Sequence, residues 1–501
     1  MKLFKTSGLV IGLVLLTTLV AAIALFLGRF AYVEITGPAV DDFHLSAKKS
    51  YLNQIEPSEQ KKFNVVVVFF DDLGWGDLSS YGNPFIETPH MDALANQGLR
   101  MTNFYSASPV CTPSRAGLLT GRFPPRTRTD RHVFFNDYHL IGIARRVLGL
   151  ANELPKEEVT LPEVLQQAGY NTHMVGKWHL GSRQGYTPTD FGFDNWFGVL
   201  YSNDMYPLHL YDNDQIVIQD EREGGFLSSE RDEWKPLPGQ GIDQTELTQM
   251  YTDKAVEFLE RQQQQQQDDK APFFLYLAHS LPHVPHYASR EHAGSSKGGT
   301  YGDVVEDLDR STGTIMQALD RLGLAENTLV IVISDNGADY NGSAGPLRGR
   351  KQDILEGGQR VPMIVSWPGK IPAGVVSDQM AMNTDVFPTL LELLQISPPT
   401  DRIIDGKSIV GTLIEDRASH EFLYYFPTTE TLPDAIRDKN FKLNWATGDP
   451  GRNREHLSRL TGTEAHEVSN LYPQAFDELK TELSELRAQV KSNPRGWVDL
   501  E

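Results

Sequence analysis

Continuous apolar runs along the chain alternate with longer segments of helical spacing. The clearest runs are residues 65–70 (Val-Val-Val-Val-Phe-Phe), 273–277 and 329–333. They are apolar at every position rather than at every second one, which is typical of strands covered on both faces. Segments such as 161–167 and 304–322 have the spacing of helices that would cover those faces. The alternation predicts an α/β fold with a large, mostly parallel sheet flanked by helices.

The amino-terminal segment has a different pattern. Lys2 and Lys5 precede an almost unbroken apolar run over residues 8–28, close to the roughly 20 residues that cross a bilayer. We expect an uncleaved membrane anchor whose lysine end is cytoplasmic. The Ala-Ile-Ala sequence at 22–24 offers a cleavage site, so a cleaved signal that yields a secreted protein is the alternative. In both cases the body is exported, and in an anchored protein it faces the periplasm or the extracellular side.

Composition divides the remaining chain into three parts. Residues 29–61 are polar and mixed, and are expected to form a linker. Residues 62–400 carry the alternating pattern and are expected to form the main domain. A Pro-Pro-Thr-Asp sequence at 398–401 interrupts this pattern. Residues 401–501, which include a charged helix with leucine spacing near 476–490, are expected to form a smaller α+β domain.

Charge and cysteine content narrow the possible partners. The 501 residues include 46 Lys and Arg against 66 Asp and Glu, giving a formal net charge of −20. Such acidity argues against nucleic acid as a partner, because the phosphate backbone attracts basic surfaces. An anionic substrate would have to be drawn in by a local basic pocket. The single cysteine, Cys111, excludes an internal disulfide, and nothing in the sequence indicates an oligomeric state.

Oxygen-bearing side chains follow two of the predicted strands. Asp71 and Asp72 come directly after the first apolar run, and Asp335 and Asn336 come after the run that ends at residue 333. The carboxyl ends of parallel strands meet at one edge, where open α/β sheets bind ligands. Adjacent carboxylates repel each other unless a cation or proton lies between them. Four hard donors suit calcium better than magnesium, and no histidine or cysteine pair has zinc spacing, so the pattern predicts one calcium site.

Cationic and proton-transferring side chains are expected near the same edge. Two of them follow a short strand near 171–175, one follows the 273–277 run, and one lies in a basic stretch. Such groups can hold an anion and protonate a leaving oxygen. For the last of them taken alone, a solvated basic cluster is the alternative. In chain order these residues are Lys177, His179, His283 and Lys351.

The lone cysteine opens a twelve-residue motif. Residues 111–122 read Cys-Thr-Pro-Ser-Arg-Ala-Gly-Leu-Leu-Thr-Gly-Arg. The Pro-Ser pair can start a helix, whose amino end favours negative charge, and Arg115 adds a fixed positive charge. This suits a nucleophile that meets an anion. For an isolated cysteine, a buried structural thiol is the alternative.

Residues 111–122 resemble the maturation signature of the formylglycine-dependent (type I) sulfatases, Cys-x-Pro-Ser-Arg followed by Leu-Thr-Gly-Arg, at every fixed position. The resemblance covers about 62–400, is closest to the arylsulfatase A-like branch of the alkaline phosphatase superfamily, and weakens beyond residue 420. It implies that residues 62–400 form the catalytic domain of a sulfuric ester hydrolase. It also implies that a formylglycine-generating maturation enzyme oxidises Cys111. The metal ligands that it implies around one Ca²⁺ are Asp71, Asp72, Cys111, Asp335 and Asn336.

The resemblance further implies a mechanism for cleaving a sulfate ester of a carbohydrate or aryl alcohol. The hydrated formylglycine would attack sulfur in line, expel the alcohol, and reform the aldehyde as sulfate leaves. His283, with Lys351, would protonate the departing oxygen, and His179 would deprotonate the second hydroxyl. Arg115 and Lys177 would orient and neutralise the nucleophile. The implied catalytic residues are Cys111, Arg115, Lys177, His179, His283 and Lys351, and the implied substrate-binding residues are Lys177, Ser202, His283 and Lys351.

Two other functions remain open at this point. A phosphate or phosphonate ester hydrolase of the same superfamily would share the metal-bearing strand ends. A single metal site with several cations favours sulfate, because dianionic phosphate is often met by two metals. A membrane-anchored binding protein with unmodified Cys111 would show no turnover.

A basic group follows the signature. We expect it to line the mouth of the pocket and to bind acidic groups that flank the sulfate ester. A solvated basic loop is the alternative. The group consists of Arg126, Arg128, Arg131 and His132.

Overall fold

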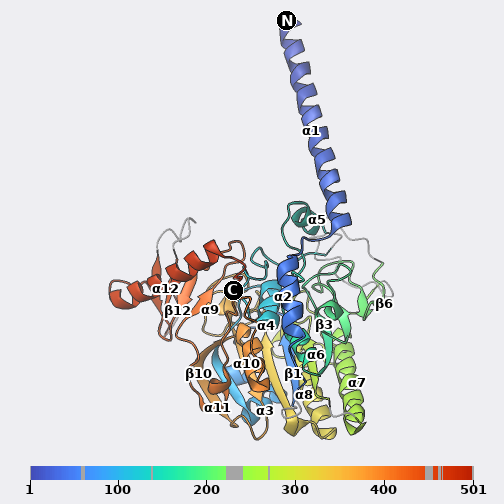
Figure 1. Cartoon of the computed structure of the whole chain (residues 1–501). Coiled ribbons are helices and arrows are strands. Elements are labelled where there is room, and N and C mark those ends of the chain that lie inside the picture. The colour runs from blue at the N-terminus through green and yellow to red at the C-terminus, as the bar shows by residue number, and fades with distance from the viewer. Residues whose placement is uncertain are drawn as a thin grey trace.

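A computed structural model describes residues 2–57, 63–136, 139–221, 241–268, 271–445, 455–460, 464 and 466–498. A body built around a ten-stranded sheet carries a smaller four-stranded sheet to one side, and a long helix extends away from the body (Figure 1). The strands of the large sheet are β1 Asn64–Phe70, β2 Leu99–Tyr105, β3 Asn171–Lys177, β4 Asn195–Val199, β5 Leu210–Asp212, β6 Gln215–Ile218, β7 Phe273–Ala278, β8 Thr328–Ser334, β9 Arg360–Ser366 and β10 Val375–Met382. The helices up to residue 415 are α1 Lys2–Thr36, α2 Asp42–Leu52, α3 Pro89–Gln97, α4 Cys111–Thr120, α5 Leu140–Val147, α6 Leu161–Gln167, α7 Leu247–Asp268, α8 Gly299–Arg321, α9 Glu356–Gln359, α10 Val386–Leu394 and α11 Val410–Glu415.

The large sheet has the order β10-β2-β9-β8-β1-β7-β3-β4-β5-β6. Strands β8, β1, β7, β3 and β4 are parallel to one another, and β10 is parallel to β2. Among the described strands of this sheet, only β9 and the short hairpin β5–β6 introduce antiparallel pairs. The mostly parallel α/β sheet expected from the apolar runs is therefore confirmed.

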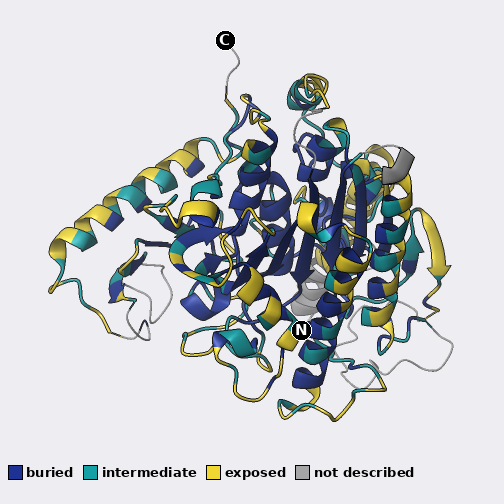
Figure 2. Ribbon diagram, turned by 90° about the horizontal axis from the view of Figure 1, so that it is seen from below, coloured by how far each residue is buried: buried dark blue, intermediate teal, exposed yellow. Residues whose placement is uncertain are grey.

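Each face of the sheet has its own hydrophobic core. Along β1, Val65 and Val67 join the core beneath α4, α6 and α10, whereas Val66 and Val68 join the core beneath α3, α7 and α8. Successive side chains of a strand point to opposite faces, so a strand with a core on both sides must be apolar at every position. Figure 2 shows the consequence, a buried central sheet with exposed residues on the outer helices, the loops and an edge strand.

The smaller part is an antiparallel sheet covered by one helix, as the expected α+β region requires. Its elements are β11 Leu423–Tyr425, β12 Ala435–Arg437, β13 Phe441–Asn444, β14 His456–Arg459 and α12 Pro473–Ser492. Leu479 and Leu483 of α12 pack on Ile436 and Leu443 of the sheet. The helix expected near 476–490 lies within α12.

A buried ionic cluster around Glu356 joins the two parts. The carboxylate accepts hydrogen bonds from Tyr105 (2.6 Å) in the large sheet and from Tyr425 (2.7 Å) in the small one. Lys442 and Arg437 each lie 3.3 Å from it. Burial alone would raise the pKa of Glu356, but Lys442 and Arg437 outweigh burial and hold that pKa at about 2. The small sheet is thus fixed on the side of the large one by charge as well as by packing.

The segment expected to be a linker is partly helical. Helix α1 continues through the first residues of 29–61, and α2 packs on the body. Lys48 forms a 2.6 Å ion pair with Glu163, and the hydroxyl of Tyr51 donates to the carbonyl of Ser397 at 2.9 Å. Polar composition suggested a linker, but the long-range partners of these residues hold α2 against the body.

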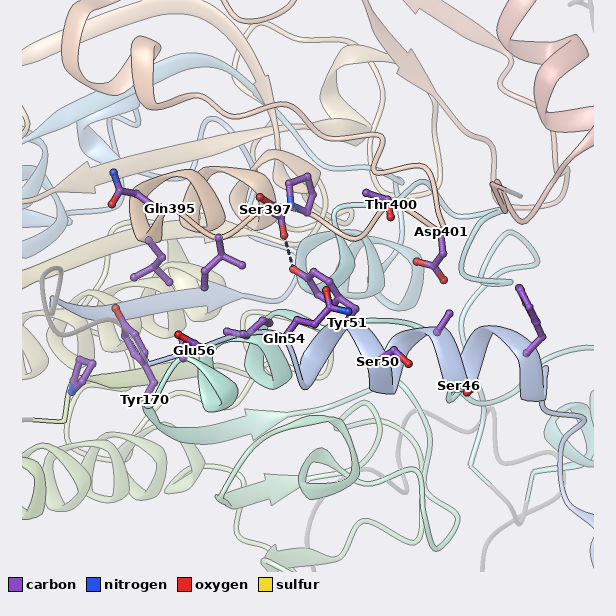
Figure 3. A pocket seen from close by; sticks show the side chains of 18 residues that line it. Ser46, Ser50, Tyr51, Gln54, Glu56, Tyr170, Gln395, Ser397, Thr400 and Asp401 are labelled. Atoms are coloured by element: carbon purple, nitrogen blue, oxygen red, sulfur yellow. Dashed lines mark hydrogen bonds between the residues drawn. The ribbon is translucent and has the colours of Figure 1, made fainter. Parts of the chain in front are cut away.

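A cavity of about 820 Å³ lies between α2 and residues 394–401 (Figure 3). Tyr170 and Pro272, which immediately precede β3 and β7, contribute to its lining. The cavity therefore lies at the amino edge of the sheet, opposite the edge to which the sequence assigns the chemistry.

Candidate active site at the carboxyl edge of the sheet

Cys111 is the first residue of α4, at the carboxyl edge of β1. The Pro-Ser pair was expected to start the helix, but α4 begins two residues earlier, directly after Val110, which is extended (φ −146°, ψ 159°). The thiol is 1% exposed and lies 3.2 Å from Oδ1 of Asp71. Cys111 therefore sits where the amino end of a helix meets the acidic cluster.

Arg115 lies one turn along α4 and connects three elements. Its guanidinium donates to Oδ2 of Asp335 (Nη2 at 2.9 Å) and to the carbonyl of Lys177 (2.8 Å). Burial alone would lower the pKa of Arg115, but Asp335 and Asp71 outweigh it and raise that pKa above its ordinary value. Arg115 is thus a permanent cation that ties α4 to the ends of β3 and β8.

The acidic residues form a compact set of metal donors. Asp71, Asp72, Cys111 and Asp335 can each offer one atom, and these atoms all lie within 4.8 Å of one another. Asp72 has a left-handed backbone (φ 70°), a conformation that costs a non-glycine residue of order 1–3 kcal/mol and is common at functional sites. The backbone N–H of Asp72 donates to Oδ1 of Asp335 at 3.0 Å, which fixes the two strand ends together.

Asn336 supplies a further donor. Its Nδ2 donates to Oδ1 of Asp72 at 2.7 Å and to the carbonyl of Gly337 at 2.9 Å. Its Oδ1 is buried and has no hydrogen-bond partner among the residues that the structure describes. A buried polar atom without a partner is costly, and a hard cation beside it removes the cost. The donor set is all oxygen apart from Cys111, which fits calcium.

Burial and the charges of this cluster shift the pKa values of its acidic groups in opposite directions. Burial raises the pKa of Asp335 to about 7, and the charge of Asp71 adds to that rise. Burial would also raise the pKa of Asp71, but Lys177, followed by other nearby cations, holds it well below the ordinary value. Burial and Asp71 together raise the pKa of the Cys111 thiol well above its ordinary value. A divalent cation between such carboxylates favours their ionised forms.

Lys177 and Ser202 form the next part of the site. Lys177 was expected just beyond a strand, and it is the last residue of β3. Its Nζ lies 2.5 Å from Oδ2 of Asp71 and donates to Oγ of Ser202 at 3.1 Å. The hydroxyl of Ser202, which follows β4, lies 3.4 Å from Nδ1 of His283. Three strand ends thus contribute to one polar chain.

His283 is oriented by two carbonyl acceptors. Its Nδ1 lies 2.6 Å from the carbonyl of Val284 and 3.1 Å from Oδ1 of Asn203. Because both partners accept, Nδ1 carries a hydrogen. That leaves Nε2 facing the acidic cluster, 3.8 Å from Oδ2 of Asp72. His283 can therefore hold or release a proton at Nε2.

Lys351 reaches the cluster from a tightly closed loop. Its Nζ donates to Oδ2 of Asp72 at 2.8 Å. Burial would lower the pKa of Lys351, but Asp72 and neighbouring negative groups raise it well above its ordinary value. Its neighbour Arg350 is exposed and donates to the carbonyl of Tyr340 at 2.9 Å. Lys351 is therefore not part of a solvated basic cluster.

Glycine at position 357 allows this loop to close. The N–H of Gly357 donates to the carbonyl of Arg348 at 2.7 Å, and a Cβ on Gly357 would lie 2.2 Å from the carbonyl oxygen of Gly349. Any side chain would push the two ends of the loop apart. The close approach of these backbones sets the position of Lys351.

His179 comes two residues after Lys177 in the chain and has a strained backbone conformation (φ 60°). Its Nε2 lies 3.1 Å from the carbonyl of Phe134 and donates to it, while Nδ1 is buried without a partner in the described part of the chain. Burial, followed by the charges of Lys177 and Arg115, holds the pKa of His179 well below its ordinary value. The imidazole is therefore neutral, and its Nδ1 is an open proton acceptor.

The structure brings all but one of the expected site residues into a single network of contacts. His179 adjoins this network, because its carbonyl accepts a hydrogen bond from Thr112, the neighbour of Cys111, at 3.0 Å. Sequence reasoning gave no role to Asn203, which orients His283 and is itself held by Gln244 at 3.1 Å. Its position directly after Ser202, beyond β4, is the signal that could have identified it. The residues in the network are Asp71, Asp72, Cys111, Arg115, Lys177, Ser202, His283, Asp335, Asn336 and Lys351.

The expected basic group at the pocket mouth is not a unit. Arg126 is fully buried and bonds to Asn493 (2.7 Å), Gln489 (3.2 Å) and Asp405 (3.4 Å), so it braces α12 against the body. Arg131 is half exposed. Burial, and then the charge of Lys351, lower the pKa of His132. The expectation is wrong for Arg126, because its partners come from far along the chain.

Comparison with known proteins agrees with this geometry. Residues 63–396 match the family model described as "Sulfatase", and residues 350–492 match the model described as "N-sulphoglucosamine sulphohydrolase, C-terminal". An N-acetylgalactosamine-6-sulfatase of Canis lupus familiaris is 40% identical over 375 residues, covering 72% of this chain and 68% of that protein. A steryl-sulfatase of Rattus norvegicus is 32% identical over 450 residues, covering 76% of each.

A solved structure shows the same fold. A sulfatase of Bacteroides thetaiotaomicron, from work on the metabolism of glycosaminoglycans, superimposes with a TM-score of 0.74 at 28% identity. The match covers 86% of this chain and all of that one. The family-model match over residues 350–492 extends the similarity to the smaller sheet.

Proposed function

The chain belongs to the sulfatase family and is a sulfuric ester hydrolase, and we propose that it cleaves a sulfated carbohydrate or an aryl sulfate with a formylglycine made from Cys111 and one calcium ion. The observation that carries this proposal is the position of Cys111. It begins α4, touches Asp71 at 3.2 Å, and belongs to a donor set that two lysines contact directly. Family membership removes the binding-protein alternative, and one candidate metal cluster in the described part of the chain favours sulfate over phosphate.

The residues around Cys111 divide the work of the reaction. Once oxidised and hydrated, position 111 supplies one oxygen that attacks sulfur and a second that lets sulfate leave as the aldehyde reforms. Lys177 and Lys351 hold the sulfuryl oxygens, since each presents an ammonium at the cluster. Nε2 of His283 gives its proton to the departing alcohol oxygen. Nδ1 of His179, the open acceptor, takes the proton of the second hydroxyl.

The residues that would hold calcium are the acidic strand ends and position 111. A bound ion would supply positive charge at the sulfuryl oxygens and lower the pKa of the attacking hydroxyl. Arg115 keeps the same acids in place through its bonds to Asp335. The implied ligands are Asp71, Asp72, Cys111, Asp335 and Asn336.

Oxidation of Cys111 requires a maturation enzyme with access to the thiol. In the folded chain Cys111 is 1% exposed, and all of α4 is buried. We therefore infer that the maturation enzyme acts before α4 packs against the sheet.

The substrate is inferred from the relatives. The first of them is named for a sulfated amino sugar and another for sulfated sterols. The higher identity of the first relative supports a sulfated carbohydrate as the substrate. Arg131 and His132 remain candidates for contacting acidic groups beside the ester.

We further propose that α1 anchors the body to a membrane on its exported side. Residues Val14–Thr36 have a mean hydropathy of 2.1, and residues 14–29 are exposed throughout. The helix continues without interruption past the Ala-Ile-Ala sequence at 22–24, and Glu34 near its end pairs with Arg146 (3.3 Å) and Arg183 (3.1 Å) of the body. These contacts favour an anchor over a cleaved signal.

The test is release of inorganic sulfate by full-length protein made together with a maturation enzyme. The panel includes 4-nitrophenyl sulfate, 6-O-sulfated N-acetylgalactosamine and 4-nitrophenyl phosphate. We expect sulfate release from at least one sulfate ester, slower phosphate release, and a loss of at least about 1,000-fold in Cys111→Ala, as for other nucleophile deletions. Phosphate release that is faster than sulfate release, or a Cys111→Ala variant with full activity, would contradict the proposal.

A further inference from the structure

Helix α5 and the loop that follows it at 148–150 bury charged side chains and expose apolar ones. The two arginines of the helix, Arg145 and Arg146, are 7% and 5% exposed. Ile141, Leu148 and Leu150 are 47%, 73% and 41% exposed. A helix on a water-facing surface places its apolar side against the core and its charges outward. Here the apolar side faces out.

This orientation is fixed by polar contacts on the inner side. Nε and Nη2 of Arg145 donate to the carbonyl of Ala151 at 2.9 and 2.7 Å. Arg146 forms its ion pair with Glu34 of α1. Turning the apolar side inward would break these bonds and leave two buried charges without partners. The exposed apolar side is therefore a built feature of the fold.

The apolar side of α5 lies level with the end of the apolar stretch of α1. The carbonyl of Val147 accepts a hydrogen bond from Nε of Arg29 at 3.4 Å, and Arg29 is the first charged residue after the apolar run 8–28. Tyr32, one turn further, is 57% exposed, and tyrosine is enriched at membrane–water interfaces. Figure 1 shows α5 beside the base of α1. If α1 spans a bilayer, Leu148 is at the depth of its interfacial layer.

The side of the body from which α1 extends is also the side of the catalytic edge, that is, the carboxyl edge of the large sheet. At the start of α2, Asp42 lines a cavity together with Tyr186, whose carbonyl accepts from Trp178, the residue directly after β3. At the other end of α2, Gln54 lines the cavity of Figure 3 together with Tyr170, the residue directly before β3. Helix α2 thus runs antiparallel to the strands, and α1, which precedes it, leaves the body at the carboxyl edge.

We propose that α5 and the corner at 148–150 lie in the interfacial layer of the bilayer that α1 spans, as a second contact that holds the catalytic edge toward the membrane. This rests on the membrane anchoring proposed above. The occupant of the apolar side is lipid, because that side is continuous with α1 and begins where the apolar stretch of α1 ends. Phe134, six residues before α5, accepts the hydrogen bond of His179. One segment therefore connects the membrane contact with a residue that borders the site.

The test uses full-length protein in phosphatidylcholine vesicles with a nitroxide spin label at position 148. In a Cys111→Ala background the introduced cysteine of Leu148→Cys is unique, and its exposed side chain leaves the core untouched. Val20→Cys in α1 reports insertion of the anchor. Val376→Cys, 54% exposed at the start of β10, is the matched control on the opposite edge. The readout is collision with oxygen, which partitions into lipid, against a water-soluble nickel chelate.

We expect the label at 148 to collide with oxygen and to be shielded from nickel, as at position 20, and the label at 376 to show the reverse. A water-exposed label at 148 with a lipid-exposed label at 20 would overturn the second contact and leave the anchor intact. A water-exposed label at 20 would overturn the anchor itself. Spin–spin broadening at 148 that disappears on dilution with unlabelled chain would assign the apolar side to a second copy.

Discussion

Sγ of Cys111 lies 3.2 Å from Oδ1 of Asp71, with the thiol enclosed between the amino end of α4 and the carboxyl end of β1. The same carboxylate pairs with Lys177 at 2.5 Å. Asp71, the residue directly after β1, therefore connects the position that is to become the nucleophile with a cation that can hold the substrate. This contact exists because the two strand-end loops and the helix converge on a single edge of a parallel sheet.

Burial of Cys111 predicts when it can be oxidised. Protein made in a host without a maturation enzyme should keep its thiol when that enzyme and oxygen are added to the folded chain. The same protein should gain the aldehyde when the enzyme is present during refolding from denaturant, because α4 then passes through an exposed state. Peptide mass after each treatment checks this. Equal conversion of the folded chain would contradict it.

Lys351 and its neighbour offer a matched pair of variants. Lys351→Ala should lower kcat/KM for sulfate esters by about 100- to 1,000-fold, the loss seen when one preorganised donor to a developing negative charge is removed. Arg350→Ala removes an exposed side chain that faces Tyr340 and should change kcat/KM by less than about twofold. Steady-state kinetics on 4-nitrophenyl sulfate measures both. Similar losses in the two variants would show that the loop contributes only general charge.

Calcium should stabilise the folded protein. Removing divalent cations with a chelator should lower Tm, and calcium at about 100 times its Kd should restore roughly 3 kcal/mol of stability, a shift of several degrees. Asn336→Ala removes the unpartnered buried oxygen and should weaken this response. Asp320→Asn, on an exposed part of α8, should respond like the wild type. An unchanged calcium response in Asn336→Ala, measured by calorimetry, would remove Asn336 from the ligand set.

The lowered pKa of Glu356 predicts that the stability of the folded protein depends on pH. Its folded pKa of about 2 is below its ordinary value of 4.5, so the stability that it contributes is present above about pH 4.5 and is lost as the pH falls toward 2. Glu356→Gln should destabilise the protein at neutral pH by roughly 3–5 kcal/mol, since buried cations lose their partner. The difference in Tm from the wild type should then narrow as the pH falls through this window.

Glu392→Gln is the control for this experiment. Its side chain is exposed on α10, so its Tm should follow that of the wild type at every pH. A constant difference between Glu356→Gln and the wild type across the window would mean that the cluster stabilises by packing rather than by charge.

Sequence reasoning recovered the large sheet and most of the site for one physical reason. A strand covered on both faces is apolar at every position, so β1, β7 and β8 are visible as unbroken runs, and the residues after them share an edge by topology. The same reasoning failed where the partner of a residue is distant in sequence. Arg126 lies among basic neighbours in the sequence, but its side chain pairs with Asp405. Asn203 contributes to the site by orienting His283.

The surface of the protein was less predictable still. The spacing in α5 marks an apolar side and a polar side, but spacing alone does not say which side faces the body. Burial of Arg145 and Arg146 depends on carbonyls and acids from other segments. In the same way, composition suggested a linker over 29–61, whereas contacts with Glu163 and Ser397 hold α2 against the body. No local sequence pattern indicates these contacts.

The central claim is that Cys111 becomes the nucleophile, and the most direct test is the mass of the tryptic peptide Met101–Arg115 from protein that releases sulfate. The account predicts an aldehyde in place of the thiol, with activity proportional to the fraction converted. A fully active preparation in which this peptide carries an unmodified cysteine would contradict it.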